Sequence, residues 1–214
     1  MSVFPALLDR AGRSFARFVT NAVMRVPRSW PLLRGPLRVQ FDKLAPRWDE
    51  RLSDVHMAPY EAALGAVHPA PRRALDLGTG TGAGAFAIAT HFPHAEVVGA
   101  DLAEGMLAEA RRKTPEALAG RVRFERADAA RLPYRDGEFE LVALANMIPF
   151  FDELARITAS GGHVLLSFSS GPETPIYVPL ERIRTELERR GFAEFARFAA
   201  GNGTAVLARK PAAS

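Results

Sequence analysis

Apolar residues recur at helical spacing over residues 4–26, with polar residues on the opposite face. The apolar positions are Phe4, Leu7, Leu8, Ala11, Phe15, Phe18, Val19, Ala22, Val23 and Val26. Pro27 ends the pattern, because proline disrupts a helix interior. We therefore expect an amphipathic helix and, over residues 28–36, a proline-rich connector, which together form a first segment, residues 1–36.

A second segment, residues 37–71, also carries helical patterns. The first begins near residue 37 and is interrupted by Pro46. Two shorter ones follow, over residues 48–55 and 59–67. We expect this segment to be helical throughout, apart from its turns.

From residue 73 onward, short apolar runs alternate with helical patterns, as is typical of an α/β sheet. The expected strands are residues 74–77, 96–100, 122–126, 139–145, 163–169, 192–198 and 204–209. The expected helices are residues 83–90, 103–113, 151–158 and 179–190. The last two strands flank Gly201-Asn202-Gly203, a composition that favours a hairpin. The pattern predicts an α/β fold with a seven-stranded, mostly parallel sheet, an antiparallel C-terminal hairpin and a helical N-terminal extension.

The composition narrows the chemistry. The chain has 214 residues, a length sufficient for one hydrophobic core. It has no cysteine, which excludes disulfide frameworks, thiolate zinc sites and cysteine nucleophiles. No His, Asp or Glu cluster has ligand spacing, so we expect no catalytic metal. No apolar stretch approaches the ~18 residues of a membrane span, and we expect a cytoplasmic protein.

Positive charge is concentrated at the N-terminus. Residues 1–47 hold nine Arg and Lys side chains and two Asp, whereas the whole chain has a net charge of only +4. The basic, amphipathic segment 3–26 therefore has two interpretations, which the sequence leaves open. In the first, the segment contacts an anionic membrane surface and the protein is membrane-peripheral. In the second, the segment packs on the domain or on a second copy of the chain in a homodimer.

A glycine-rich turn follows the first expected strand and contains Asp76, Gly78, Thr79, Gly80 and Gly82. Glycine permits left-handed backbone conformations and lets a ligand approach the main chain, as in nucleotide-binding strand-to-helix turns. The turn also satisfies the dinucleotide fingerprint, because Ala83 occupies its last small position. Alone, it indicates a nucleotide-type cofactor without identifying it.

Asp101 ends the second expected strand, 19 residues after Gly82. A carboxylate there can accept hydrogen bonds from both ribose hydroxyls, in nicotinamide enzymes and in methyl-donor enzymes alike. A nicotinamide oxidoreductase would also need a Tyr-x-x-x-Lys pair or its equivalent. None of Tyr60, Tyr134 and Tyr177 has a lysine four residues on.

Asp128 follows the third expected strand, and residues 132–142 lead into the fourth. Together with the glycine turn and Asp101, this order of motifs resembles the class I S-adenosylmethionine-dependent methyltransferases. The similarity covers about residues 40–210 and is to the small-molecule group, which includes ubiquinone and menaquinone C-methyltransferases and methyltransferase type 11 domains. It implies a Rossmann-like, S-adenosylmethionine-binding domain over residues 72–211.

The resemblance implies roles for individual residues around the donor. Asp101 would hold the ribose, and Leu102 and Met106 would lie beside the adenine. Asp128 would accept from the exocyclic amine of adenine, and Ala129 would donate its backbone N–H to the ring.

At the other end of the donor, the resemblance places Asp76 and the turn 78–82 beside the methionine moiety. Asn146, just after the fourth strand, would lie where this end meets the acceptor pocket. Residues 41–49 resemble the family's lid helix, F-D-x-x-A-x-x-Y-D, with Trp48 in place of tyrosine. Segment 37–71 is therefore expected to form a helical lid.

His56 lies in the lid segment near Met57 and Tyr60, and is the candidate general base for an acceptor hydroxyl or amine. A surface or helix-capping role for His56 stays open. Residues 146–150 lack the consecutive prolines of the Asn-Pro-Pro-Phe motif of enzymes that methylate nucleic-acid amines. We expect no nucleic-acid substrate.

The expected function is transfer of a methyl group from S-adenosylmethionine to a small, apolar, aromatic or lipid-like acceptor by in-line displacement. Two alternatives remain: a nicotinamide-dependent oxidoreductase, and a cofactor-binding or membrane-surface protein without turnover. The sequence does not choose the acceptor or the methylated atom.

Overall fold

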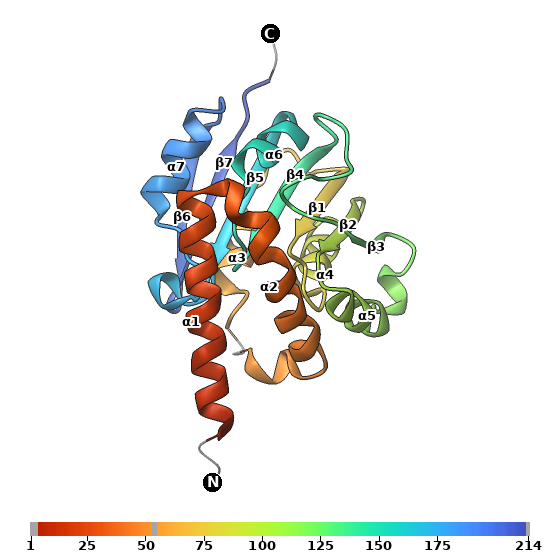
Figure 1. Ribbon diagram of the computed structural model, residues 1–214. Coiled ribbons are helices and arrows are strands. Elements are labelled where there is room, and N and C mark those ends of the chain that lie inside the picture. The colour runs from red at the N-terminus through yellow and green to blue at the C-terminus, as the bar shows by residue number, and fades with distance from the viewer. Residues whose placement is uncertain (1–3, 53–54, 213–214) are drawn as a thin grey trace.

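The computed structural model describes residues 4–52 and 55–212. Its centre is a seven-stranded sheet in the order β3-β2-β1-β4-β5-β7-β6 (Figure 1). The strands are β1 (Arg73–Leu77), β2 (Glu96–Asp101), β3 (Val122–Arg126), β4 (Phe139–Ala145), β5 (Thr158–Phe168), β6 (Ala193–Ala200) and β7 (Gly203–Arg209). All neighbouring strands are parallel except that β7 runs antiparallel to β5 and β6. The predicted fold class is confirmed, including the C-terminal hairpin.

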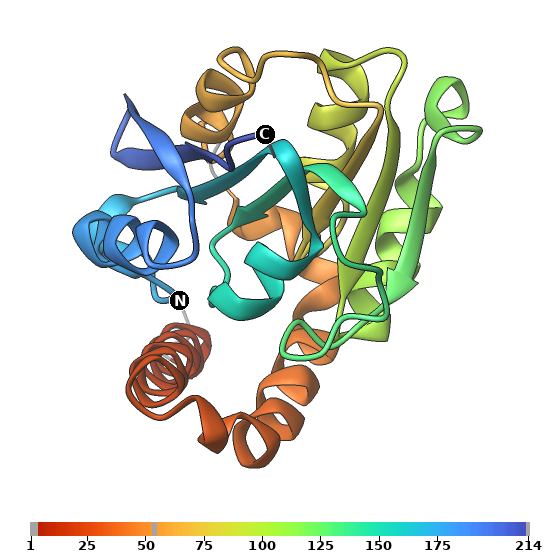
Figure 2. The same ribbon diagram turned by 90° about the horizontal axis from the view of Figure 1, so that it is seen from above.

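Helices cover both faces of the sheet. The helices are α1 (Phe4–Arg25), α2 (Trp30–Leu44), α3 (Ala58–Leu64), α4 (Ala83–His91), α5 (Glu104–Lys113), α6 (Phe151–Ile157) and α7 (Leu180–Glu188). Helices α3, α4 and α5 share one apolar core with the sheet, and α6 and α7 share the other. Helices α1 and α2 form a separate layer beside the domain (Figure 2).

The strands read as continuous apolar runs because both faces are buried. In β1, Leu75 and Leu77 point into the core with α6 and α7, whereas Ala74 points into the core with α3 to α5. This alternation follows from the two-residue period of a strand. Burial on both faces fixes the register, since a slip of one residue would exchange the two sets.

One stripe of α1 packs on the rest of the protein. Val19 and Val23 are buried in a cluster with Trp30, Leu37 and Ile148. The packing interpretation is therefore confirmed for this stripe, although Phe18, predicted on the same apolar face, is 60% exposed. The structure does not describe the side chains of Phe4, Leu7 and Leu8, nor any part of residue 3. The predicted packing of these residues stays a prediction.

The prediction of a connector over residues 28–36 is wrong for most of its length, because α2 begins at Trp30. Pro31 lies in the first helical turn, where a missing N–H costs nothing. Pro36 lies inside the helix and removes the N–H that would bond the Leu32 carbonyl. Burial of Trp30 and Leu37 compensates for this defect.

Two other boundaries differ from expectation. A 3₁₀ turn, Asp49–Arg51, replaces the first part of the helix predicted over 48–55, and residues 53–54 of that helix lie outside the described ones. Strand β5 begins at Thr158, before the Gly161-Gly162 pair that was expected to precede it, and its pairing with β4 shifts register there.

Candidate functional site

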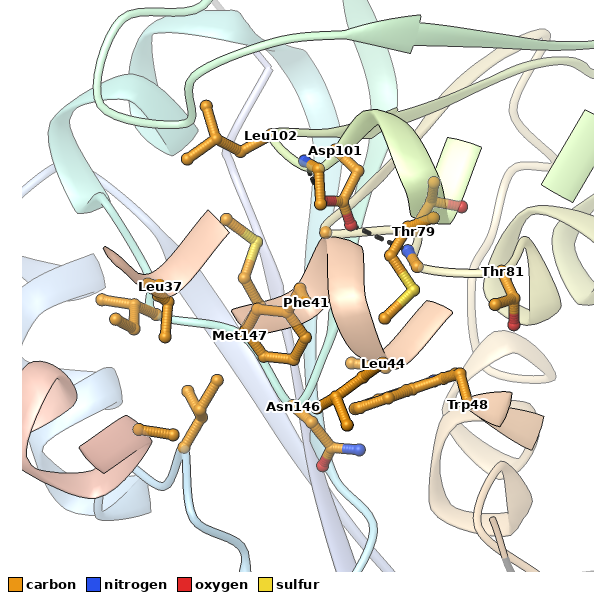
Figure 3. Close-up of a pocket in the computed structure, with 18 of the residues that line it drawn as sticks. Leu37, Phe41, Leu44, Trp48, Thr79, Thr81, Asp101, Leu102, Asn146 and Met147 are labelled. Atoms are coloured by element: carbon orange, nitrogen blue, oxygen red, sulfur yellow. Dashed lines mark hydrogen bonds between the residues drawn. The ribbon is translucent and has the colours of Figure 1, made fainter. Parts of the chain in front are cut away.

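The chain order along the sheet reverses at β1, which lies between β2 and β4. In open α/β sheets, ligands bind beyond the carboxyl ends of the strands at such a switch point. A cavity of about 920 Å³ lies there. Its wall combines the ends of β1, β2 and β4 with the N-terminal helices, and Figure 3 shows Leu37, Phe41, Leu44 and Trp48 facing Thr79 and Asp101 across it.

The glycine turn after β1 depends on left-handed backbone at three positions. The φ angles are +72° at Gly78, +53° at Gly80 and +96° at Gly82, which side-chained residues rarely adopt. A Cβ on Gly78 would lie 2.6 Å from the Met147 sulfur. A Cβ on Gly80 would meet only Trp48 Nε1, at 3.8 Å, so Gly80 opens onto the cavity.

Asp101 meets this turn from the end of β2. Its Oδ2 accepts a hydrogen bond from the Gly80 N–H and its Oδ1 accepts one from the Ala103 N–H, both at 2.9 Å. Burial raises the pKa of Asp101, although these backbone donors partly offset the effect. Each oxygen retains a lone pair, so the carboxylate can accept two more hydrogen bonds from a ligand's hydroxyls. The open glycine and this carboxylate fit an adenosine-type donor.

Asp76 lies deeper, at 2% exposure, near the carboxyl end of β1. It accepts hydrogen bonds from the Thr79 hydroxyl at 2.6 Å and the Tyr60 hydroxyl at 3.0 Å. Burial raises the pKa of Asp76 to about 6, against the lowering effect of these bonds. Burial and the neighbouring carboxylate raise the pKa of Tyr60 well above its ordinary value, so its hydroxyl stays a donor.

Sequence reasoning missed two residues that shape the surroundings of Asp76, one by a hydrogen bond and one by leaving room for the carboxylate. Tyr60 comes from α3, and nothing in its spacing connects it with β1. Gly84 lies in the first turn of α4, where a Cβ would be 2.4 Å from Asp76 Oδ1. The sequence signal for Gly84 was present, as one more small residue after the glycine turn.

Two carboxylates fasten segment 37–71, which the resemblance predicts to be a lid, to the domain. Asp42 accepts from the Gly105 N–H at the start of α5, at 2.9 Å, and pairs with Arg38 at 2.7 Å. Asp49 accepts from the Thr81 hydroxyl at 2.7 Å and pairs with Lys113. Burial raises the pKa of Asp49, but hydrogen bonds from Lys113 and Thr81 outweigh it and bring the pKa below its ordinary value.

Next to each of these carboxylates in the sequence, an aromatic ring faces the cavity. Phe41 and Trp48 pack edge to face, with ring centroids 5.5 Å apart. Trp48 occupies the position that the family motif gives to tyrosine, and both rings line the cavity. The lid therefore supplies an apolar wall opposite the glycine turn.

At the end of β4, Asn146 adopts a left-handed backbone with φ +51°. Its side-chain carbonyl accepts from the Ser169 N–H at 2.9 Å, which ties the end of β4 to the end of β5. Asparagine tolerates this backbone better than most residues. Asn146 and Ser169 both line the cavity.

Most of the predicted site residues line one cavity, namely His56, Asp76, Gly78, Thr79, Gly80, Asp101, Leu102, Met106, Ala129 and Asn146. Gly82 and Asp128 are not part of its wall. A Cβ on Gly82 would instead meet the Phe86 ring at 2.8 Å, so this glycine allows close helix packing. Asp128 is bound by Trp30 and Arg34 of α2, at 2.7 and 2.6 Å.

A parallel sheet with β7 inserted antiparallel between β5 and β6, and a glycine turn facing a strand-end carboxylate, define a Rossmann-like methyltransferase domain. Residues 74–164 match the family described as "Methyltransferase domain". The fold, the site and this match support a class I S-adenosylmethionine-dependent methyltransferase.

Curated relatives carry several activities. The chain is 43% identical over 147 residues to demethylmenaquinone methyltransferase of Thermus thermophilus, a match that covers 62% of this chain and 66% of that protein. It is 36% identical over 151 residues to malonyl-[acyl-carrier protein] O-methyltransferase of Halorhodospira halophila, covering 66% and 50%. The chain thus spans between half and two thirds of the length of these relatives.

Solved structures share the fold at low identity. A chain of the complex between the Haloferax volcanii Trm112 methyltransferase activator and the putative methyltransferase superposes with a TM-score of 0.67 at 18% identity, covering 80% of this chain and 97% of that one. Human N-acetylserotonin methyltransferase in complex with S-adenosylmethionine superposes with a TM-score of 0.62 at 18% identity, covering 81% and 56%.

The first prediction concerns Asp101. Replacing Asp101 by Ala should weaken S-adenosylhomocysteine binding by about 1.5 to 3 kcal/mol, or about 10- to 150-fold, because hydrogen bonds to a charged group are lost. Calorimetric titration measures this change. Glu96→Ala, at the exposed opposite end of β2, is the matched control and should bind as the wild type does. Unchanged affinity in a folded Asp101→Ala variant would remove Asp101 from the site.

The second prediction concerns the buried charge of Asp76. Its pKa is 3.8 in the unfolded chain and about 6 in the folded one, so the folded state binds the extra proton between these values. The contribution of Asp76 to the free energy of unfolding should therefore fall by about 2 kcal/mol as pH rises from 4 to 6. Urea unfolding of the wild type and Asp76→Asn over this range should show the wild type losing stability relative to the variant. Parallel pH profiles would contradict the assignment.

Proposed function

We propose that this chain transfers the methyl group of S-adenosylmethionine to a quinol-type aromatic acceptor. The observation that carries the proposal is a single cavity that joins the residues fit for the donor with an apolar lid wall. Curated relatives named as demethylmenaquinone methyltransferases support an acceptor of this class. Relatives named as malonyl-carrier and trans-aconitate methyltransferases make a carboxylate the rival acceptor.

On this proposal, the donor site is formed by the glycine turn, Asp101, Leu102 and Met106. When bound, S-adenosylmethionine supplies an electrophilic methyl group on a positively charged sulfur. Asp101 accepts hydrogen bonds from the ribose, and the open backbone at Gly80 accommodates the methionine part. Met106, 1% exposed beneath the cavity, limits the space on the adenine side.

The acceptor side is built from Leu37, Phe41, Leu44, Trp48 and Ile176, all of which line the cavity. These side chains hold a flat, apolar molecule and exclude water from the site. Orientation of two reactants in this way is worth up to ~7 to 11 kcal/mol of the barrier. The protein's main contribution is therefore positioning.

A quinol becomes a stronger nucleophile when it loses a hydroxyl proton. His56 lines the same cavity, at its lid side, and an imidazole nitrogen can accept that proton. We therefore assign His56 the role of an assisting general base, acting on the acceptor hydroxyl.

The third prediction tests donor and acceptor together. Calorimetry should show binding of S-adenosylhomocysteine and no comparable binding of NADH. The reason is that the lid residues Phe41 and Trp48 close the cavity opposite the glycine turn. With S-adenosylmethionine present, a reduced 2-polyprenyl-1,4-naphthoquinol should gain one methyl group, detected by mass spectrometry. Trans-aconitate and a malonyl thioester serve as carboxylate comparators. Tighter binding of NADH would overturn the proposed cofactor, and preferential methylation of a carboxylate would overturn the proposed acceptor.

We also propose that the outer surface of α1 and α2 meets an anionic membrane, which would deliver a lipid-soluble quinol. Three apolar side chains of this region support the proposal: Phe18, Val26 and Leu32 are 60%, 56% and 80% exposed. Arg25 and Arg28 lie between them in the sequence and are also exposed. Within the described residues, no helix is long and apolar enough to cross a membrane.

The fourth prediction tests this surface by co-sedimentation with phosphatidylglycerol and with phosphatidylcholine vesicles. Arg25→Gln combined with Arg28→Gln should weaken binding to the anionic vesicles, since each basic residue contributes ~1 kcal/mol. Phe18→Ser combined with Leu32→Ser should weaken binding to both. Val55→Ser, an exposed valine outside α1 and α2, is the control. A wild-type chain that stays in the supernatant with anionic vesicles at low salt would end the membrane proposal.

A further inference from the structure

The carboxylate of Asp128 is held by two side chains that lie almost a hundred residues earlier in the chain. The indole Nε1 of Trp30 donates to Asp128 Oδ1 at 2.7 Å, and the guanidinium of Arg34 donates to Oδ2 at 2.6 Å. The backbone N–H of Ala130 also donates to Oδ1, at 3.0 Å. Short hydrogen bonds to an ionised carboxylate are among the stronger ones in proteins. Both oxygens of Asp128 are thus engaged by protein donors.

Trp30 is itself a buried part of the cavity wall. Its side chain is only 6% exposed, and its ring packs edge to face against Phe150 with centroids 5.2 Å apart. Both rings line the cavity. Trp30 is also the first residue of α2, so its position fixes where that helix starts.

The contact is made beside the adenine end of the donor site. Ala127 and Ala129, the neighbours of Asp128, line the cavity although Asp128 does not. The Ala127 N–H donates to the Asp101 carbonyl at 3.0 Å, which joins the ends of β2 and β3. Through Asp128, the first turns of α2 are therefore tied to the strand ends that carry Asp101.

We propose that Trp30 and Arg34 are positioning residues of the donor site, acting through Asp128. The anchor holds the start of α2 against the loop after β3, so that the Trp30 ring closes the cavity there. Asp128 is not part of the cavity wall, so it serves as the anchor of α2 and does not read the exocyclic amine of adenine. This inference rests on the proposed binding of S-adenosylmethionine.

The two partners contribute unequally. Arg34 is 49% exposed, and solvent weakens an ion pair at such a position. Trp30 is buried, so loss of its N–H leaves the carboxylate short of a partner in a region that water does not reach freely. Trp30 is therefore expected to have the larger effect.

The experiment measures S-adenosylhomocysteine affinity by calorimetry in matched variants. Trp30→Phe keeps an aromatic ring and removes the N–H, and we expect its affinity to fall about 10-fold. Arg34→Ala should lower affinity about 3-fold, and Arg34→Lys should restore part of that loss by keeping the charge. Arg28→Ala, an exposed arginine just before α2, is the control and should bind as the wild type does.

A second ligand separates the anchor from adenine recognition. S-inosylhomocysteine carries a carbonyl oxygen in place of the exocyclic amine. If Asp128 anchors α2, the ratio of the two affinities should be equal in the wild type and in Asp128→Asn, even where both affinities fall. If Asp128 accepts from the amine, the wild type should discriminate strongly against the inosyl ligand and Asp128→Asn should reduce that discrimination.

Three outcomes are decisive. A lower affinity in Trp30→Phe and Arg34→Ala together with an unchanged ligand ratio in Asp128→Asn supports the anchor. Wild-type affinity in both Trp30→Phe and Arg34→Ala overturns it, as does a changed ligand ratio in Asp128→Asn. Should Trp30→Phe fail to fold, Arg34→Ala and its lysine rescue carry the test. A wild-type chain that binds neither ligand contradicts the proposed donor itself, which is a separate result.

Discussion

The buried carboxylate of Asp76 is the constraint around which the donor side of the site is arranged. A charge this far from water is tolerated only when hydrogen-bond donors surround it. Here the hydroxyl groups of Thr79 and Tyr60 supply two of them. The need for these donors brings α3 against the end of β1. It also excludes any side chain at Gly84, so that α4 can begin close to the strand. The glycine turn is thus held from below, and its free face is left for a ligand.

The same principle attaches the lid. Asp42 and Asp49 on the N-terminal segment find donors on the domain, and Asp128 on the domain finds donors on α2. Each contact joins residues far apart in sequence at the rim of one cavity. Because only residues 169–179 separate β5 from α7, these carboxylates and the apolar stripe of α1 hold the elements that close the site. Carboxylate hydrogen bonds therefore attach the lid to the domain, and the apolar side chains of α1 pack against it.

The sheet was predictable because its signals are local. Apolar runs, strand-end acids and glycine turns each lie within a few residues, and parallel connections then leave few topologies. This is why the positions of Asp101 and the turn followed from sequence. The pairings of Tyr60 with Asp76 and of Trp30 with Asp128 did not, since they are set by tertiary packing and leave no periodic signal. The connector predicted over residues 28–36 was wrong for the opposite reason. Pro36 disfavours a helix locally, but the burial of its neighbour Leu37 overrides this preference.

The division between donor and acceptor surfaces explains what similarity to known proteins can reveal. The family match covers residues 74–164, which hold the glycine turn, Asp101 and Asn146. Most of the apolar acceptor wall, including Leu37, Phe41 and Trp48, lies before that range. Relatives named as demethylmenaquinone and as malonyl-[acyl-carrier protein] methyltransferases can therefore both resemble this chain in the donor site. On the proposed function, the choice of acceptor is therefore made by α2 and the turns after it, whose aromatic and aliphatic side chains suit a flat, apolar molecule better than a small charged one.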